Sequence, residues 1–98
     1  MKVVWSPLAI DRAGEIAEYI AQDNSIAAES WIETVFAKVE QLQSFPESGR
    51  TVPEINNPKI KELLYGNYRI IYRTGEKLIS ILTIRHVKQI LPTDEIMA

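Results

Sequence analysis

The chain has 98 residues, of which 46% are hydrophobic and 24% charged, with a formal net charge of −2 and no cysteine. This length predicts one domain over residues 1–98, whose core is large enough to fold without covalent staples. The absence of cysteine excludes disulfides and thiolate metal sites, and we expect no metal and no other cofactor. Because no stretch approaches the ~20 apolar residues of a membrane span, we expect a cytoplasmic protein without membrane contact.

The charges are distributed unevenly along the chain. Residues 1–48 contain three basic and eight acidic side chains, whereas residues 49–98 contain eight basic and five acidic ones. Proteins that coat nucleic acid are strongly basic, so this balance argues against general coating and allows one localised basic face. The simpler interpretation is that these side chains are only solvated surface charges.

The first half of the chain predicts a strand followed by two helices. Residues 3–5 form a short apolar run that is typical of a strand. Ser6 and Pro7 then indicate a helix start, because serine caps free amides and proline suits the first helical position. Apolar residues at three- and four-residue spacing predict helices over residues 7–22 and 26–44. The short break between them makes the pair an antiparallel hairpin.

The second half predicts a small sheet. Pro46 ends the second helix, and an irregular crossing follows as far as Pro58. Strands are predicted over residues 60–65, 68–74 and 78–85, joined by tight turns that contain Gly66 and Gly75. We expect residues 87–98 to be a weakly structured tail. The fold class is therefore α+β, with an N-terminal strand, an antiparallel helical hairpin and a mostly antiparallel three-strand sheet in the order β-α-α-β-β-β.

Five segments, in this order and at this spacing, carry a resemblance over almost the whole chain. They are Trp5-Ser6-Pro7-Leu8-Ala9, Phe45-Pro46-Glu47-Ser48-Gly49-Arg50, Ile60-Lys61-Glu62-Leu63, Tyr68-Arg69-Ile70-Ile71-Tyr72-Arg73 and Ile84-Arg85-His86. The chain resembles the ParE/RelE superfamily of toxins from type II toxin–antitoxin modules, the plasmid stabilisation proteins. The resemblance implies a cognate antitoxin that wraps an acidic, apolar segment around the toxin, in a groove between hairpin and sheet. It also implies a toxin–antitoxin hetero-oligomer.

Two branches of the superfamily imply different targets. ParE-like members are not nucleases and inhibit DNA gyrase, whereas RelE-like members are ribosome-dependent endoribonucleases that cut messenger RNA. The resemblance to RelE-like members implies that Arg69 holds the phosphate and His86 acts as general acid. It also implies that Glu54, Lys59 or Lys61 supplies the base. Of these, Arg69, His86 and Glu54 form the candidate catalytic set.

The ParE branch is favoured for two reasons. Nucleases that act inside the ribosome are usually strongly basic, and this chain is not. The long helical hairpin and the 46–50 link also look more like ParE. The enzymatic reading thus stays an alternative, and a detoxified relic that only binds antitoxin is a third.

The candidate partner-binding residues lie mostly on the predicted strands. On an even strand period, Arg69 and Arg73 share one side, which suits an anion patch. The full candidate set is Arg50, Lys61, Arg69, Arg73, Arg85 and Lys88. Three of the candidate residues also have a purely structural interpretation. In this interpretation Arg73 pairs across strands with Glu62, Arg50 braces its loop, and His86 bonds a backbone carbonyl. Core or rim packing is expected for Trp5, Trp31, Tyr68 and Tyr72.

Overall fold

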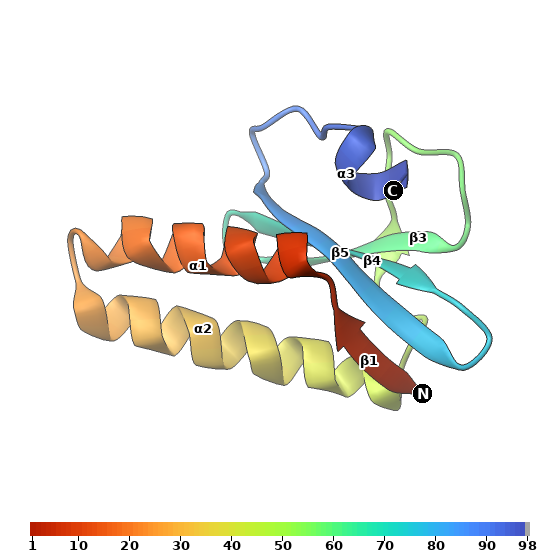
Figure 1. Ribbon diagram of the computed structural model, residues 1–98, viewed down its shortest axis with the longest axis horizontal. Coiled ribbons are helices and arrows are strands. Elements are labelled where there is room, and N and C mark those ends of the chain that lie inside the picture. The colour runs from red at the N-terminus through yellow and green to blue at the C-terminus, as the bar shows by residue number, and fades with distance from the viewer. Residues whose placement is uncertain (98) are drawn as a thin grey trace.

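The computed structural model describes residues 1–97 and contains three helices, one short 3-10 turn and five strands (Figure 1). In chain order these are β1 (Lys2–Trp5), α1 (Pro7–Ala21), α2 (Ser25–Glu40), the 3-10 turn Gln41–Gln43, β2 (Arg50–Thr51), β3 (Ile60–Tyr65), β4 (Tyr68–Thr74), β5 (Leu78–His86) and α3 (Asp94–Met97). Among these residues no helix combines the length and the hydrophobicity that crossing a bilayer requires.

All five strands belong to one mixed sheet in the order β1-β5-β4-β3-β2. The pair β1–β5 is parallel, and the other three pairs are antiparallel. The predicted α+β class and the order of strand, helical hairpin and antiparallel strands are confirmed. The sheet has two more strands than the three predicted, because β1 joins it beside β5 and Arg50–Thr51 adds a short edge at β3.

Both long helices begin at side-chain caps. The Ser6 hydroxyl accepts a hydrogen bond from the Ala9 amide at 3.0 Å, and it also donates to the Leu82 carbonyl at 3.0 Å. Asn24 caps α2 by accepting from the Ala27 amide at 3.0 Å. Each cap satisfies an amide that a helix start leaves free. The bond to Leu82 also fixes the start of α1 against β5.

The α1–α2 hairpin covers one face of the sheet and forms the main core with it (Figure 1). Trp31 is buried there against the ring of Tyr68, and Trp5 packs on Phe36 with ring centroids 4.8 Å apart. The hydroxyl of buried Tyr72 donates to the Pro46 carbonyl at 3.0 Å and accepts from the Gly49 amide at 2.9 Å. The expected packing roles of both tryptophans and both tyrosines are confirmed, and Tyr72 ties the 46–49 link to the sheet.

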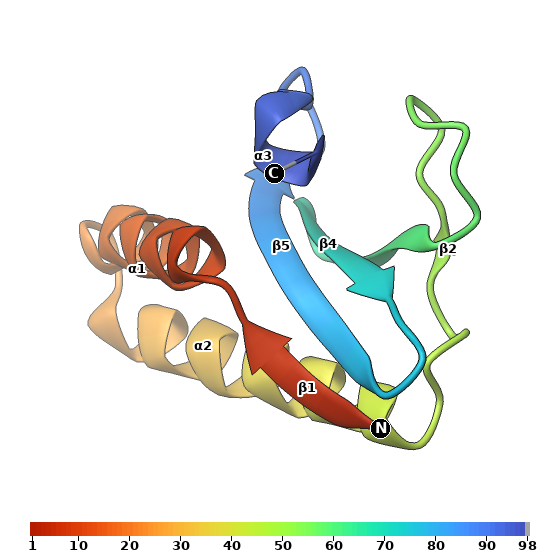
Figure 2. The ribbon, with the colours of Figure 1, turned by 45° about the vertical axis from the view of Figure 1, so that its right-hand side comes forward.

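The opposite face of the sheet carries a second, smaller core. Its buried members come from the crossing segment, the strands and the C-terminal segment: Val52, Ile60, Ile71, Leu91 and Ile96. Helix α3 lies beside the end of β5 (Figure 2). The expectation of a weakly structured tail is therefore wrong for residues 91–96, because two apolar side chains there gain burial against the sheet.

A bulge in β5 decides which side chains reach this second face. Ile71 pairs with Thr83, but the next residue of β4, Tyr72, pairs with Ile81, so Leu82 is an extra residue in β5. Leu82 packs on the smaller core, while Ile81 and Ile84 both belong to the main core. The bulge thus turns Thr83 and Arg85 toward α3 rather than toward the helical hairpin.

Candidate functional site

The first cluster of charged side chains lies on the second face, between β3, β4 and the crossing segment. Arg69 donates from Nε to Glu62 Oε1 at 2.7 Å and, through both terminal nitrogens, to the two oxygens of Glu54 at 2.7 and 2.8 Å. Arg50 Nε donates to the other oxygen of Glu62 at 2.6 Å. Two guanidinium groups and two carboxylates therefore neutralise each other within one cluster.

Burial shows how tightly this cluster is closed. Arg69 is 6% exposed and Glu62 is 1% exposed. The bond from Arg69 is the main reason why the pKa of Glu54 lies below its usual range, and the bond to Glu54 is the main reason why the pKa of Arg69 is raised. The expectation that Arg69 stands open on a basic sheet face is wrong, because buried Glu62 requires a paired cation.

Glu62 also shows which cross-strand pair forms. It lies opposite Ile71, with Arg69 and Arg73 on either side of that position in β4. The proposed pair of Arg73 with Glu62 is wrong: Glu62 bonds Arg69 and Arg50, and Arg73 lies opposite Ile60. Arg50 does brace its loop as the simpler interpretation held, although its side chain stays 59% exposed.

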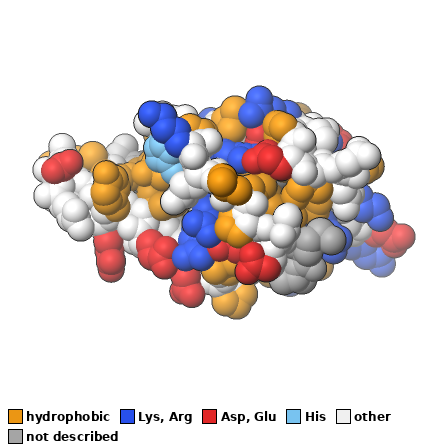
Figure 3. Space-filling view, turned by 90° about the horizontal axis from the view of Figure 1, so that it is seen from above, with side chains coloured by type: hydrophobic (Ala, Val, Ile, Leu, Met, Phe, Trp, Pro, Cys, Tyr) orange, Lys and Arg blue, Asp and Glu red, His pale blue; other side chains and the backbone are white. Residues whose placement is uncertain are grey.

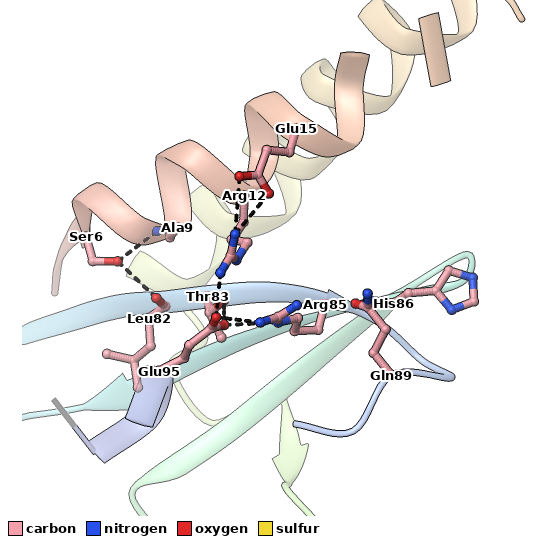
Figure 4. Close-up of polar contacts among 10 residues, drawn as sticks. All are labelled: Ser6, Ala9, Arg12, Glu15, Leu82, Thr83, Arg85, His86, Gln89 and Glu95. Carbon is pink, nitrogen blue, oxygen red and sulfur yellow. Dashed lines mark hydrogen bonds and ion pairs between the residues drawn. The ribbon is translucent and has the colours of Figure 1, made fainter. Parts of the chain in front are cut away.

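The second cluster joins α1, β5 and α3 around Glu95 (Figure 4). Glu95 Oε1 accepts from Arg85 Nε at 3.0 Å and from Thr83 Oγ1 at 2.8 Å, while Oε2 accepts from Arg12 at 2.6 Å and from Arg85. Burial alone raises the pKa of Glu95, but the bonds from Arg12, Arg85 and Thr83 lower it to about 2. Arg12 also pairs with Glu15 on its own helix. Arg85 is thus not an open cation, contrary to expectation.

The candidate catalytic residues do not share one face of the sheet. Arg69 and Glu54 meet, but as a closed ion pair rather than as a clamp and a free base. His86 packs edge-on against Tyr68, with ring centroids 5.4 Å apart, and Tyr68 contacts the main core on the other face. His86 Nδ1 accepts from the Lys88 amide at 3.1 Å, so it bonds backbone as one interpretation held, although to an amide and not a carbonyl.

The remaining predicted partner-binding residues differ in availability. Lys61 is paired with Glu47 at 3.1 Å and its side chain is largely buried. Arg73 and Lys88 are exposed and form no ion pair with residues 1–97. The exposed cations of the original set are therefore Arg50, Arg73 and Lys88.

A cleft of about 480 Å³ lies between α1 and the end of the sheet where β4 begins and β5 ends. Its walls combine aromatic, amide and guanidinium groups, and they are formed by Arg12, Glu15, Ile16, Tyr19, Asn67, Tyr68, Ile84, Arg85, His86 and Gln89. Of these, sequence reasoning had singled out only Tyr68, Arg85 and His86. Arg12 and Glu95 were missed because their pairing depends on a contact between residues 83 positions apart.

Comparison with known proteins gives one family and one fold. A family model described as ParE toxin of type II toxin–antitoxin system, parDE, matches residues 3–91. A solved chain from the chromosomal ParDE system of P. aeruginosa is similar in fold, with a TM-score of 0.71 and 21% identity over 88% of this chain and 95% of that one. No curated protein matches by sequence. The match over residues 3–91 shows that the chain belongs to the ParE toxin family of type II toxin–antitoxin systems.

Proposed function

We propose that this ParE-family toxin acts on DNA gyrase as a non-enzymatic inhibitor and that a cognate antitoxin neutralises it. The observation that carries the proposal is the family match over residues 3–91, together with the separation of Arg69 from His86. A nuclease needs clamp, acid and base around one phosphate. Here His86 packs on Tyr68 on one face, while Arg69 and Glu54 neutralise each other on the other.

The proposed toxic contacts use basic side chains that are exposed in the protein without a partner. Lys88 and Arg73 are two such side chains, and Arg50 is a third, because its side chain stays 59% exposed although its Nε donates to Glu62. Arg69, Arg85 and Lys61 already hold carboxylates of this chain, so a partner would have to displace Glu62, Glu95 or Glu47 to reach them. In this proposal these three residues shape the surface and do not make the first contact.

The proposed antitoxin seat is the cleft between α1 and the sheet. An acidic, apolar segment would meet apolar and aromatic walls there, next to the ring of Tyr19, and would compete with Glu95 for the guanidinium groups of Arg12 and Arg85. Tyr19 is 69% exposed, so its ring is available to a partner. Tyr19→Ala should weaken antitoxin binding at least tenfold. Ile26→Ala, at an equally exposed apolar residue outside the cleft, should leave it unchanged.

One pair of assays separates the target hypotheses. Purified protein is added to a gyrase supercoiling reaction and, in parallel, to an in vitro translation reaction in which messenger cleavage is mapped. We expect inhibited supercoiling and intact transcripts, with inhibition weakened in Arg50→Ala/Lys88→Ala and retained in Lys38→Ala. Cut transcripts with normal supercoiling would establish the RelE-like alternative instead. Inhibition of neither reaction would indicate a relic that only binds antitoxin.

A further inference from the structure

One end of the sheet gathers four basic side chains that are far apart in sequence. Lys2 begins β1 and its amide bonds the Lys77 carbonyl at 3.3 Å, just before β5. Lys59 precedes β3, and its carbonyl accepts from the Thr74 amide at 2.9 Å, next to Arg73. The starts of β1, β3 and β5 and the finish of β4 therefore meet at this end. We name Lys2, Lys59, Arg73 and Lys77 the basic sheet end.

The charges of the basic sheet end are uncompensated, unlike those of the sheet face. All four side chains are exposed, and none forms an ion pair with residues 1–97. The turn between β4 and β5 also contains one acidic residue, Glu76. Even after Glu76 is counted, this end keeps a local excess of positive charge.

The net charge of −2 does not cancel this excess, because the acidic side chains lie mostly elsewhere. Seven of them belong to residues 11–40, in the helical hairpin and its connection. The molecule is 39 Å long, whereas screening at 0.1 M salt acts over about 10 Å. In Figure 3 basic side chains lie at the right-hand end, beside an acidic one, and further acidic side chains lie toward the other end.

We propose that the basic sheet end binds the phosphodiester backbone of duplex DNA. Adjacent strands are ~4.8 Å apart, so a row across β1, β5, β4 and β3 spans about 14 Å, the axial length of about four base pairs. Three of the four cations are lysines, which contact phosphate as point charges and need no shaped pocket. None of the four lines the cleft between α1 and the sheet. The contact is therefore independent of base sequence.

Salt-dependent binding to a labelled 20-base-pair duplex tests the proposal, with fluorescence anisotropy as the readout. The logarithm of the binding constant should fall with the logarithm of salt, with a slope of magnitude about 3.6 for four phosphate contacts. Lys59→Gln and Lys77→Gln should each lower that magnitude by about 0.9, and the double variant by about 1.8. Lys38→Gln removes the same charge from α2, where Lys38 lies over the Tyr65 ring, and should leave the slope unchanged.

Two further arms complete the test. Glu76→Gln should tighten binding at low salt, because it removes the acidic group of the same turn. Poly-glutamate serves as competitor, and at equal charge it should displace the protein less well than unlabelled duplex does. Equal loss in Lys38→Gln and Lys77→Gln, no measurable binding at low salt, or preferential binding of poly-glutamate would each overturn the proposal. Gyrase is absent from the assay, so its result leaves the target hypothesis separately testable.

Discussion

Arg69 and Arg85 lie directly opposite each other on β4 and β5, yet each is neutralised by carboxylates from a different segment. Arg69 bonds Glu62 of β3 and Glu54 of the crossing segment, whereas Arg85 bonds Glu95 of α3. Like charges that face each other across strands destabilise a sheet. The three acidic side chains therefore make this arginine pair compatible with the fold, and they also keep it from acting as an open basic face.

Glu62→Gln should destabilise the protein strongly. The carboxylate is buried and serves both Arg69 and Arg50, and breaking a buried pair costs about 3–5 kcal/mol. Glu54→Gln is the matched control, because Glu54 is 46% exposed and its loss should cost about 1 kcal/mol. Urea unfolding followed by circular dichroism measures both. Equal costs for the two variants would show that Glu62 is not the anchor of the cluster.

Stability should fall in acid because of Glu95. Its pKa is about 2 in the folded state against 4.5 ordinarily, so the stabilisation is complete above pH 4.5 and is lost as the pH falls toward 2. The loss should amount to about 3 kcal/mol. Glu95→Gln should remove most of this pH dependence, and the two proteins should converge in stability near pH 2. Glu15→Gln, at the exposed partner of Arg12, should keep the wild-type profile.

Two glycines should respond in opposite ways to alanine. A Cβ on Gly49 would lie 2.5 Å from the Tyr72 hydroxyl and 2.7 Å from the Glu62 carbonyl oxygen, so the 46–49 link must shift. We expect Gly49→Ala to cost about 1–3 kcal/mol. Gly14 lies within α1 with nothing within 4 Å of its Cβ position, so Gly14→Ala should stabilise by up to about 1 kcal/mol. Thermal melting compares them, and a destabilised Gly14→Ala would contradict this assignment.

Ile96→Ala tests whether α3 is a real part of the fold. Ile96 is 2% exposed in the smaller core, and truncating a buried isoleucine costs about 2–5 kcal/mol. Ile90 is 91% exposed, so Ile90→Ala should change the free energy of unfolding by less than about 0.5 kcal/mol. Indistinguishable chemical denaturation curves for the two variants would mean that residues 91–96 do not pack as described.

Much of the fold could be predicted because its signals are local. Ser6 and Pro7 set the start of α1, and the predicted strands 60–65 and 68–74 coincide with β3 and β4. The second helix ends earlier than predicted, at Glu40, since the chain tightens into a 3-10 turn. The parallel placement of β1 beside β5 carries no local signal, because it joins residues more than seventy positions apart.

The charged clusters could not be predicted for a different reason. Strict alternation along residues 78–86 puts Arg85 on the same side as Ile79 and Ile81, and the bulge at Leu82 reverses this. The resemblance placed Glu54 near Arg69, but as a base and not as its ion-pair partner. Glu95 comes from a segment without a sequence period, so nothing indicated which arginine it would reach. The sequence indicates that the strands carry basic residues, but it does not indicate which carboxylates neutralise them.

The bond between Arg12 and Glu95 can form only after almost the whole chain has been translated. Arg12 leaves the ribosome early, and Glu95, 83 positions later, leaves it after Arg12, Thr83 and Arg85. Until Glu95 is synthesised, the nascent chain holds two guanidinium groups without the carboxylate that they share, and the apolar side chains under α3 remain exposed to water. An antitoxin already present during translation would thus meet a toxin whose second face is not yet closed.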